Sequence, residues 1–238
     1  MASKKIKTIL IGTTNEAKYR LYNDILSGLK EYGIEIKKLP EDADAALIVK
    51  EASDSLTQNA VQKAMTYARS KKMITIADDT GFFIPALNNE PGVAVRRWGG
   101  KLPSNISDAE WEKYFLTRLR ESPIREPKAI KSLVIACSNP AGNHQTSEFQ
   151  ITGTIKVPGC GSYTAGGPLS SYFFIDQCNR FEAELTQKEK DILFGELKLK
   201  LIDMLLRYGH LERGSRNSLE IGAEIIQKHG TLTTQKGG

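Results

Sequence analysis

The sequence predicts an α/β protein with a mixed central sheet and flanking helices, and three observations support this prediction. In the first third of the chain, short apolar stretches alternate with helical repeats, which favours parallel strands joined by helices. Residues 130–137 and 148–157 are strand-like stretches joined by the turn-rich segment SNPAGNHQTS, which predicts an antiparallel hairpin added to that core. The composition, with 40% hydrophobic and 26% charged residues among 238, excludes a mainly disordered or collagen-like chain.

The first two strands enclose the first helix. Residues 6–11 (IKTILI) predict a buried strand, and residues 12–15 (GTTN) a turn. Apolar residues at helical spacing predict a helix over 16–32, which Gly33 ends. Residues 33–39 alternate in polarity as a second strand would, so this region predicts a strand–helix–strand unit.

The second helix and the third strand precede a pair of acidic residues. Ser55 or Thr57 is expected to cap the helix. The side chains that we expect on its core-facing side are Ala60, Ala64, Tyr67 and Ala68. Residues 73–77 predict a short strand, which the turn-like segment Asp78-Asp79-Thr80-Gly81 follows at once.

The second half of the chain adds long loops and two helices. Residues 86–105 are rich in Gly, Pro and Asn and predict a long loop, of the kind that is often functional in a compact domain. A helix is expected over 108–121 with Ser107 as its cap. A glycine-rich loop over 158–171 leads to a short strand, and one long helix is expected over 185–209.

The domain prediction is a single domain over 1–209 followed by a polar tail. No internal repeat or interdomain linker interrupts the first of these ranges. Residues 210–238 turn polar and contain one weak helical pattern. The length permits one large domain or two small ones, and the unbroken alternation of elements favours one.

The net charge and the pattern of apolar residues limit which partners and which cellular compartment the protein can have. The net charge is +5, which suits an anionic partner, either nucleic acid or a small polyphosphate. The basic residues occur as scattered pairs, which are usually solvated surface, so the charge alone does not favour nucleic acid. No apolar run is long enough to span a membrane, and the apolar stretch near the N-terminus is too short for a secretory signal. Three widely spaced cysteines suggest neither a disulfide framework nor a zinc site. We therefore expect a cytoplasmic protein with no membrane partner.

Three features carry the chemistry of a phosphate and metal site. The turn before the first helix contains Thr14, Asn15 and Lys18, so backbone N–H groups and one ammonium can meet a phosphate there. An asparagine turn with a surface lysine is the plainer interpretation of this feature alone. Asp78 and Asp79 follow a strand and can hold Mg²⁺ and orient a water molecule, although D-x-x-G is also a common turn.

The third feature combines a loop with the helix that follows it. Glu51 can supply another oxygen ligand to the metal ion. Lys63 lies four residues after Asn59, on the same face of the predicted helix. Taken alone, this group is more simply a solvated charge pair on a helix.

Together these features make the chain resemble the inosine triphosphate pyrophosphatase family, whose members hydrolyse non-canonical purine nucleoside triphosphates to the monophosphate and pyrophosphate. The family's T-G-N-x-x-K-x-x-E is matched by Thr13-Thr14-Asn15 and Lys18, and its E-x(7)-N-A-x-x-K-A by Glu51, Asn59-Ala60 and Lys63-Ala64. Its I-A-D-D-S-G, L-x-x-x-P-G and Arg are matched by Ile76 to Gly81, by Leu87 and Pro91-Gly92, and by Arg97. Its A-E-L-T-x-x-E-K is present from Ala183 to Lys190.

The resemblance implies a role for each matched residue. Asp79 would be the general base or the carboxylate that positions water, with Lys18 as a second catalytic group. The implied metal ligands, for Mg²⁺, are Glu51, Asp78 and Asp79. The implied substrate-binding residues are Thr14, Asn15, Lys18, Lys63, Thr80, Arg97 and Lys190. The family usually forms homodimers, so the resemblance also implies a homodimer.

The chain departs from the family at two acidic positions, one of them near the metal, and where the base is read. The family Glu after the first Lys is Leu21, and the Glu before Asn-Ala is Gln58. The stacking loop G-G-F-G-Y-D-P is replaced by Gly166-Gly167 and 168–172 (PLSSY), and the oxo-reading S-H-R by 194–196 (FGE). Residues that bind phosphate and metal are kept, whereas those that bind the base differ, which predicts an altered base preference. Glu196 as an acceptor for an amine, and stacking by Tyr172, Phe173 or Phe174, are options that residue type alone leaves open.

The leading hypothesis is therefore Mg²⁺-dependent hydrolysis of a nucleoside triphosphate to the monophosphate and pyrophosphate, with base specificity altered from the usual ITP and XTP. The alternative is a catalytically weak nucleotide-binding or sensor protein on the same fold, because Leu21 and Gln58 remove two acidic groups. A basic nucleic-acid-binding module is the third hypothesis, and it would bind with a steep dependence on salt.

Overall fold

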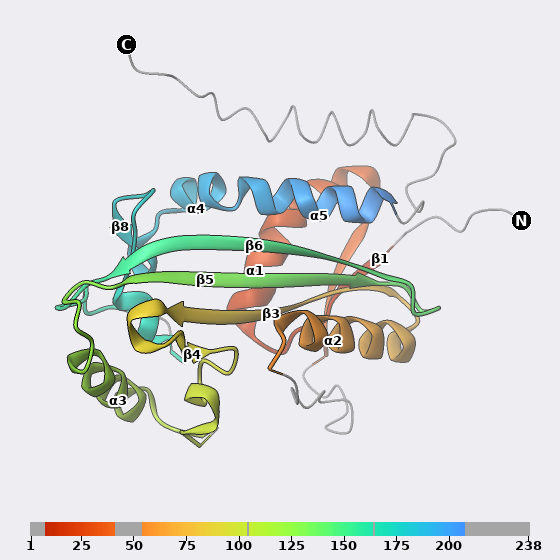
Figure 1. Cartoon of the computed structure of the whole chain (residues 1–238). Coiled ribbons are helices and arrows are strands. Elements are labelled where there is room, and N and C mark those ends of the chain that lie inside the picture. Colours follow the sequence, from red (N-terminus) through yellow and green to blue (C-terminus); the bar gives the residue numbers. More distant parts are fainter. Residues whose placement is uncertain (1–7, 41–53, 104, 164, 208–238) are drawn as a thin grey trace, which may run out of the picture.

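The computed structural model describes residues 8–40, 54–103, 105–163 and 165–207 (Figure 1). The strands are β1 (Thr8–Ile11), β2 (Glu35–Lys38), β3 (Ile74–Ile84), β4 (Glu90–Gly92), β5 (Lys128–Ser138), β6 (His144–Ile155), β7 (Phe173–Ile175) and β8 (Arg180–Phe181). The α-helices are α1 (Glu16–Leu26), α2 (Leu56–Lys71), α3 (Asp108–Arg120), α4 (Gln187–Leu193) and α5 (Gly195–Arg207). The short 3₁₀ helices are η1 (Ser27–Tyr32), η3 (Pro85–Leu87), η4 (Trp98–Gly100), η5 (Pro168–Ser171) and η6 (Glu182–Glu184).

The strands form one mixed sheet in the order β2-β1-β3-β5-β6-β7-β8, with β4 paired to β3 outside this path. β1 pairs parallel with both β2 and β3, whereas the pairs from β3 to β8 are antiparallel. The long strands β3, β5 and β6 run across the middle of Figure 1. The predicted fold class, a mixed sheet with flanking helices, is confirmed.

Local capping explains where the helices start. The side chain of Ser55 accepts a hydrogen bond from the backbone N–H of Gln58, so Ser55 and not Thr57 caps α2. Ser107 caps α3 as predicted and forms a capping box with Glu110. Because each cap satisfies backbone donors that the helix leaves unpaired, these starts follow from the local sequence.

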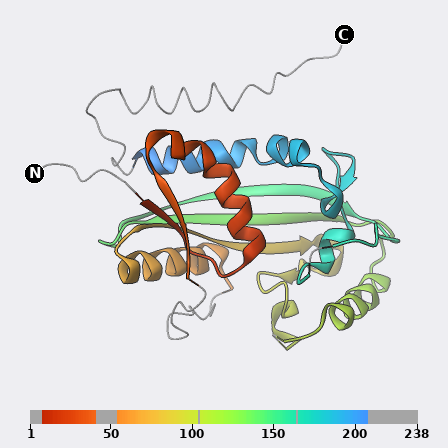
Figure 2. The ribbon, with the colours of Figure 1, turned by 180° about the vertical axis from the view of Figure 1, so that it is seen from behind.

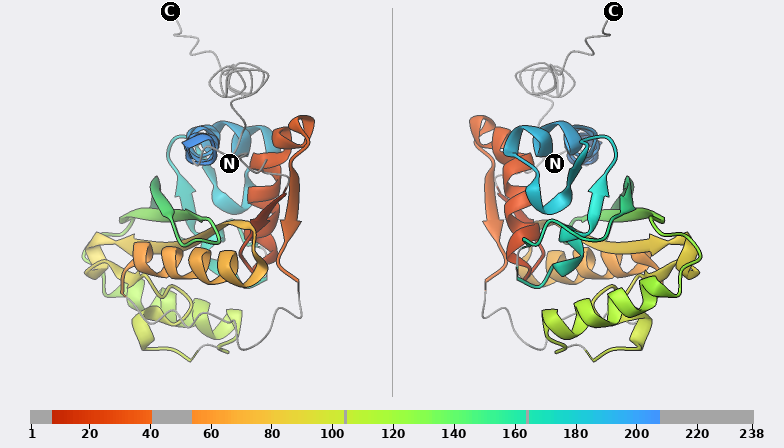
Figure 3. Two further views of the ribbon diagram at one scale, coloured as in Figure 1. Left: turned by 90° about the vertical axis from the view of Figure 1, so that its right-hand side faces the viewer. Right: turned by 90° about the vertical axis from the view of Figure 1, so that its left-hand side faces the viewer.

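Helices cover both faces of the sheet. α2 packs against β3 and β5 through the buried side chains of Ala60, Ala64, Tyr67 and Ala68, as predicted. α5 covers the opposite face and contacts α1 and β6, and the two edge views show α2 and α5 on opposite sides of the sheet (Figure 3). Figure 2, from behind, shows α1 crossing in front of the strands. The alanines let α2 approach the sheet closely, while large apolar residues fill the α1–α5 side.

Two predicted helices are shorter than expected. The helix expected over 16–32 is α-helical only to Leu26 and continues as η1, which Gly33 ends in the left-handed conformation at φ 74°. The helix expected over 185–209 is interrupted at Phe194 between α4 and α5. Gly195 disfavours a continuous helix, and Phe194 packs against Phe149 on β6, so tertiary packing determines the break. Residues 208 and 209 lie outside the described residues.

The predicted end of the third strand at residue 77 is wrong. β3 continues through the acidic pair to Ile84, because β5 pairs with it from Thr75 to Phe83. This long antiparallel partner supplies hydrogen bonds beyond the end of β1, so the turn signal in Asp78-Asp79-Thr80-Gly81 is overridden. The loop expected over 86–105 contains the end of η3, then β4 and η4.

Among the described helices, none is long and apolar enough to cross a membrane. The predicted tail over 210–238 lies outside the described residues, so the domain boundary stays a prediction.

Candidate active site

The site lies at the carboxyl end of β1, where the order of the strands in the sheet reverses. β1 has β2 on one side and β3 on the other, and right-handed crossovers therefore place α1 and α2 on opposite faces of the sheet. The crevice at the carboxyl end of such a strand is the usual ligand site of an open α/β sheet. The backbone N–H of Gly12 donates to the carbonyl of Ile76 at 2.7 Å, directly after the last residue pair of β1 and β3.

Asp78 and Asp79 occupy an unpaired stretch of the β3 edge. β1 pairs with β3 as far as Ile76, and β4 pairs with it from Phe82 onward. Among the described strands, only β5 pairs with the residues in between. The two carboxylates thus lie at an opening in the sheet edge.

Asp78 faces α1. Its Oδ2 atom accepts a hydrogen bond from Lys18 Nζ at 2.7 Å and another from Thr80 Oγ1 at 3.0 Å. Lys18 lies in the first turn of α1, so the helix that starts at the end of β1 supplies the cation.

Asp79 faces the opposite side, toward α2, because successive side chains of a strand alternate between faces. Its Oδ1 atom pairs with Lys63 Nζ at 3.0 Å, and its Oδ2 atom accepts from Asn59 Nδ2 at 2.9 Å. Each face therefore holds one carboxylate with one lysine, and the two pairs adjoin at the strand edge.

The charges of the two ion pairs are largely buried, which strengthens their effect on one another. Asp78 and Asp79 are 3% and 4% exposed, whereas the Lys18 and Lys63 side chains are 29% and 13% exposed. Burial raises the pKa of Asp78, but the charge and hydrogen bond of Lys18, with help from Lys63 and Thr80, outweigh it and leave the pKa below its usual value. Asp78 is therefore ionised at neutral pH.

A tyrosine that the sequence placed only in the core also faces this site. Tyr22 lies one helical turn after Lys18 and is 1% exposed. Its hydroxyl is buried and has no hydrogen-bond partner among the described residues. Burial and then the Asp78 carboxylate raise the pKa of this phenol, so it stays protonated near the carboxylate. The spacing of four from Lys18 is the one sequence signal for it.

Two of the remaining candidates lie in the turn before α1, and two lie on other elements of the structure. Asn15 caps α1 through Oδ1, which accepts from the backbone N–H of Lys18 at 3.1 Å, and Thr14 is exposed in the same turn. Arg97 is exposed at the start of η4, and Lys190 is exposed on α4. The proposed metal ligand Glu51 lies outside the described residues.

The departures from the family motifs have structural counterparts. Leu21 is partly buried against the core, so an apolar contact stands where the family has a carboxylate, and Gln58 is exposed on α2. Phe173 is fully buried, and Tyr172 is buried with its ring against Phe115 and its hydroxyl donating to Glu112, so neither ring is exposed for stacking on a base. Phe174 packs against Phe181.

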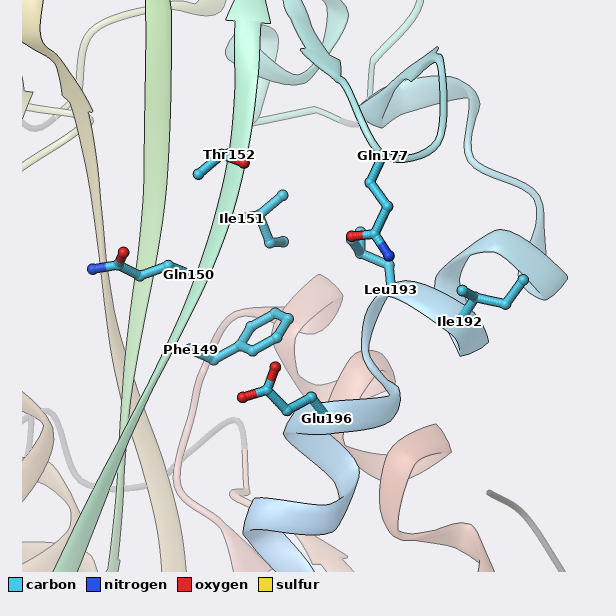
Figure 4. A pocket seen from close by; sticks show the side chains of 8 residues that line it. All are labelled: Phe149, Gln150, Ile151, Thr152, Gln177, Ile192, Leu193 and Glu196. Carbon is cyan, nitrogen blue, oxygen red and sulfur yellow. The ribbon is translucent and has the colours of Figure 1, made fainter. Parts of the chain in front are cut away.

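A small cavity lies beside Glu196, at the edge of β6. It measures about 170 Å³ and is lined by Phe149, Gln150, Ile151, Thr152, Gln177, Ile192, Leu193 and Glu196 (Figure 4). β7 pairs with β6 only from Gly153 onward, which leaves this stretch of edge open among the described strands. Glu196 is exposed and pairs with Lys200 at 2.8 Å, so its carboxylate already has a cation.

The donor set fits a hard divalent cation. Carboxylate oxygens are the ligands that Mg²⁺ prefers, and it is typically held by one or two carboxylates together with substrate phosphates. Asp78 and Asp79 supply such oxygens, and each now balances a lysine. No group of three acidic, histidine or cysteine side chains converges within the described ranges, so a metal ion here would depend on the substrate or on Glu51 to complete its coordination.

An open α/β sheet with buried carboxylates and lysines at its switch point is typical of enzymes that act on phosphorylated ligands. The chain belongs to the Ham1 family, whose model matches residues 9–193. The predicted family resemblance is thereby confirmed.

The individual relatives agree with this assignment. A dITP/XTP pyrophosphatase from Aquifex aeolicus is 31% identical over 206 residues, which are 83% of this chain and 96% of the relative. One from Geobacter sulfurreducens is 28% identical over 183 residues, or 77% of this chain and 87% of the relative. The structure of a HAM1 protein from Coxiella burnetii matches with a TM-score of 0.66 at 25% identity, over 82% of this chain and 98% of that chain.

Proposed function

We propose that this protein hydrolyses a nucleoside triphosphate to the monophosphate and pyrophosphate at the Asp78–Asp79 edge of β3. It is a hydrolase of the nucleoside triphosphate pyrophosphatase class, which its family and the names of its relatives support. The observation that carries the proposal is the pairing of two buried carboxylates with Lys18 and Lys63 at the switch point of the sheet.

In this proposal, residues on the α1 face of the sheet bind the phosphates, and residues on the α2 face activate water. Lys18, at the start of α1, and the backbone N–H groups of that helix start meet the phosphates, with Thr14 and Asn15 in the same turn. On the other face, Asp79 orients the attacking water and accepts its proton, and Asn59 and Lys63 hold the carboxylate in place.

Release of the lysines is part of the proposal. Lys18 and Lys63 now balance the carboxylates, and an incoming triphosphate competes for both ammonium groups. Thr80 keeps Asp78 oriented while Lys18 turns to the substrate. Arg97 and Lys190 add positive charge from η4 and α4.

Mg²⁺ is the proposed cofactor, held by Asp78 and Asp79 with Glu51. When bound, it would neutralise charge that develops on the triphosphate during attack by water. Asp78 is ionised and paired with Lys18, and Asp79 is paired with Lys63. Because the two carboxylates face opposite sides of β3, each would meet the ion from its own face.

The base preference is proposed to differ from that of dITP/XTP pyrophosphatases. At the positions where the family reads a 6-oxo group, Phe194 packs against Phe149, Gly195 has no side chain, and Glu196 is an acid paired with Lys200. None of these three donates a side-chain hydrogen bond to a carbonyl oxygen. A site without such donors discriminates weakly in favour of oxo bases.

The same proposal includes a cytoplasmic homodimer that binds neither nucleic acid nor membrane. Light scattering on purified protein tests the dimer, and binding to labelled duplex DNA at low salt tests the exclusion of nucleic acid, since such binding would fall steeply with salt.

The direct test is a pyrophosphate-release screen over canonical and modified nucleoside triphosphates, with and without Mg²⁺. Metal-dependent release of pyrophosphate from at least one nucleotide is expected. A nucleotide that raises the melting temperature without being turned over would favour the sensor alternative. The loss of acidic groups at Leu21 and Gln58 supports that alternative.

A further inference from the structure

The Tyr22 hydroxyl is a buried polar group that the packing of the core does not require. The ring fills the core between α1 and the sheet, and phenylalanine would fill the same space. The hydroxyl has no hydrogen-bond partner in the described part of the chain, which costs stability. Such an atom in a folded protein calls for an explanation beyond packing.

Its place in the fold points to Asp78. Tyr22 and Lys18 are four residues apart on α1 and so lie on the same helix face, the one that meets Asp78. The buried Tyr22 hydroxyl therefore lies one helical turn from the Lys18–Asp78 contact. Burial, and then the Asp78 carboxylate, raise the pKa of the phenol, so it stays protonated and can donate. No hydrogen bond of normal geometry joins them in this arrangement.

The carboxylate's present partners explain why. Lys18 and Thr80 both donate to Oδ2 of Asp78. Under the proposed function, the triphosphate draws Lys18 away, and Asp78 then keeps only Thr80 while it also faces a metal ion. A second neutral donor that cannot follow the phosphate would keep the carboxylate from rotating.

We propose that Tyr22 is a positioning residue, whose hydroxyl donates to Asp78 once substrate has drawn Lys18 away and so holds the carboxylate toward the metal ion. This inference rests on the proposed function. Tyr22 touches neither substrate nor metal in this scheme and acts through Asp78 alone.

The test compares Tyr22→Phe with the matched control Tyr19→Phe. Tyr19 lies on the same helix, and its ring faces Lys38, so the control removes a hydroxyl without reaching Asp78. For Tyr22→Phe we expect an unchanged or raised melting temperature, a Mg²⁺ requirement for half-maximal pyrophosphate release raised about tenfold or more, and an unchanged nucleotide KM at saturating Mg²⁺. Tyr19→Phe should match the wild type in all three.

A second measurement does not depend on turnover. Binding of Mn²⁺ in the presence of α,β-imido-ATP, followed by calorimetry, should weaken about tenfold in Tyr22→Phe and stay unchanged in Tyr19→Phe. Should the phenylalanine variant not fold, Tyr22→Met, which also lacks the hydroxyl, takes its place. Wild-type Mg²⁺ dependence together with wild-type Mn²⁺ binding would overturn the inference.

Failure of the proposed function gives a different pattern. A wild-type protein that releases no pyrophosphate from any nucleotide contradicts hydrolysis. The Mn²⁺ titration would still decide the role of Tyr22, because it reports the orientation of Asp78 and not catalysis.

Discussion

Asp79→Asn separates catalysis from stability because the two side chains have nearly the same shape. Asp79 accepts from Lys63 Nζ at 3.0 Å and from Asn59 Nδ2 at 2.9 Å. An asparagine has one acceptor oxygen and no charge, so it cannot serve both donors unless Asn59 turns its amide. It also cannot accept a proton from water at neutral pH.

The expected stability loss follows from the ion pair. Removing one partner of a fully buried pair costs about 3–5 kcal/mol, and Lys63, whose side chain is 13% exposed, can reach solvent and recover part of that. We expect a loss of about 2–3 kcal/mol, out of a total of about 5–15 kcal/mol for a domain, so the variant stays folded. For a domain of this size, that loss lowers the melting temperature by about 5–10 °C.

The expected loss of activity is larger. A general base or water-positioning carboxylate contributes about 10²-fold or more, so kcat for pyrophosphate release should fall at least a hundredfold, about 2.7 kcal/mol in activation free energy. Rates are measured at 20 °C with saturating Mg²⁺ and nucleotide, well below the lowered melting temperature.

Glu90→Gln is the matched control for this loss. Glu90 is a carboxylate outside the site that accepts from Trp98 Nε1 at 2.7 Å and from Arg118 Nε at 3.0 Å. This variant should lose comparable stability while keeping pyrophosphate release within a few-fold of the wild type. Turnover by Asp79→Asn within tenfold of the wild type would refute the role assigned to Asp79.

Three further predictions follow from the same geometry. Lys18→Ala should lower kcat/KM for triphosphates at least tenfold, as steady-state kinetics would measure. It should also lower the melting temperature at neutral pH, measured by scanning calorimetry, because Asp78 loses its buried partner. An unaltered kcat/KM would exclude Lys18 from substrate binding. ITP and XTP should not exceed ATP and GTP by 100-fold in kcat/KM, and a larger preference, above about 2.7 kcal/mol, would mean that other residues form an oxo-reading pocket. For Glu90, burial raises the pKa, but hydrogen bonds from Lys101, Trp98 and Arg118 lower it from 4.5 to about 2. Its contribution to stability is therefore present above pH 4.5 and lost as the pH falls toward 2. The difference in melting temperature between the wild type and Glu90→Gln should shrink over that range. A difference that stays constant would contradict this assignment.

The helix starts were predictable because their causes are local. Ser107 caps α3 through contacts within three residues, and Gly33 ends the first helical region because it adopts a positive φ. The core-facing side of α2 follows from helical periodicity alone. The motif residues were also predictable as a set, since their residue types and order are properties of the chain.

Gly195 is a local signal for a break in the last helix, but the position of the break at Phe194 and the continuation of β3 were not predictable in this way. Both depend on a strand that is distant in sequence: Phe194 packs against β6, and β3 is extended by its pairing with β5. Non-local pairing of this kind overrides local turn and helix signals, and no window of the sequence contains it.

The sequence by itself determined which groups the site has, namely two adjacent carboxylates and the lysines that match them. Only the tertiary structure decided how they are divided, with Asp78 and Lys18 on the α1 face and Asp79 and Lys63 on the α2 face. The physical reason is the alternation of side chains along β3, combined with right-handed crossovers that place α1 and α2 on opposite sides of the sheet. The same packing turned Tyr22, in sequence an ordinary apolar position of a helix, into a buried hydroxyl beside Asp78.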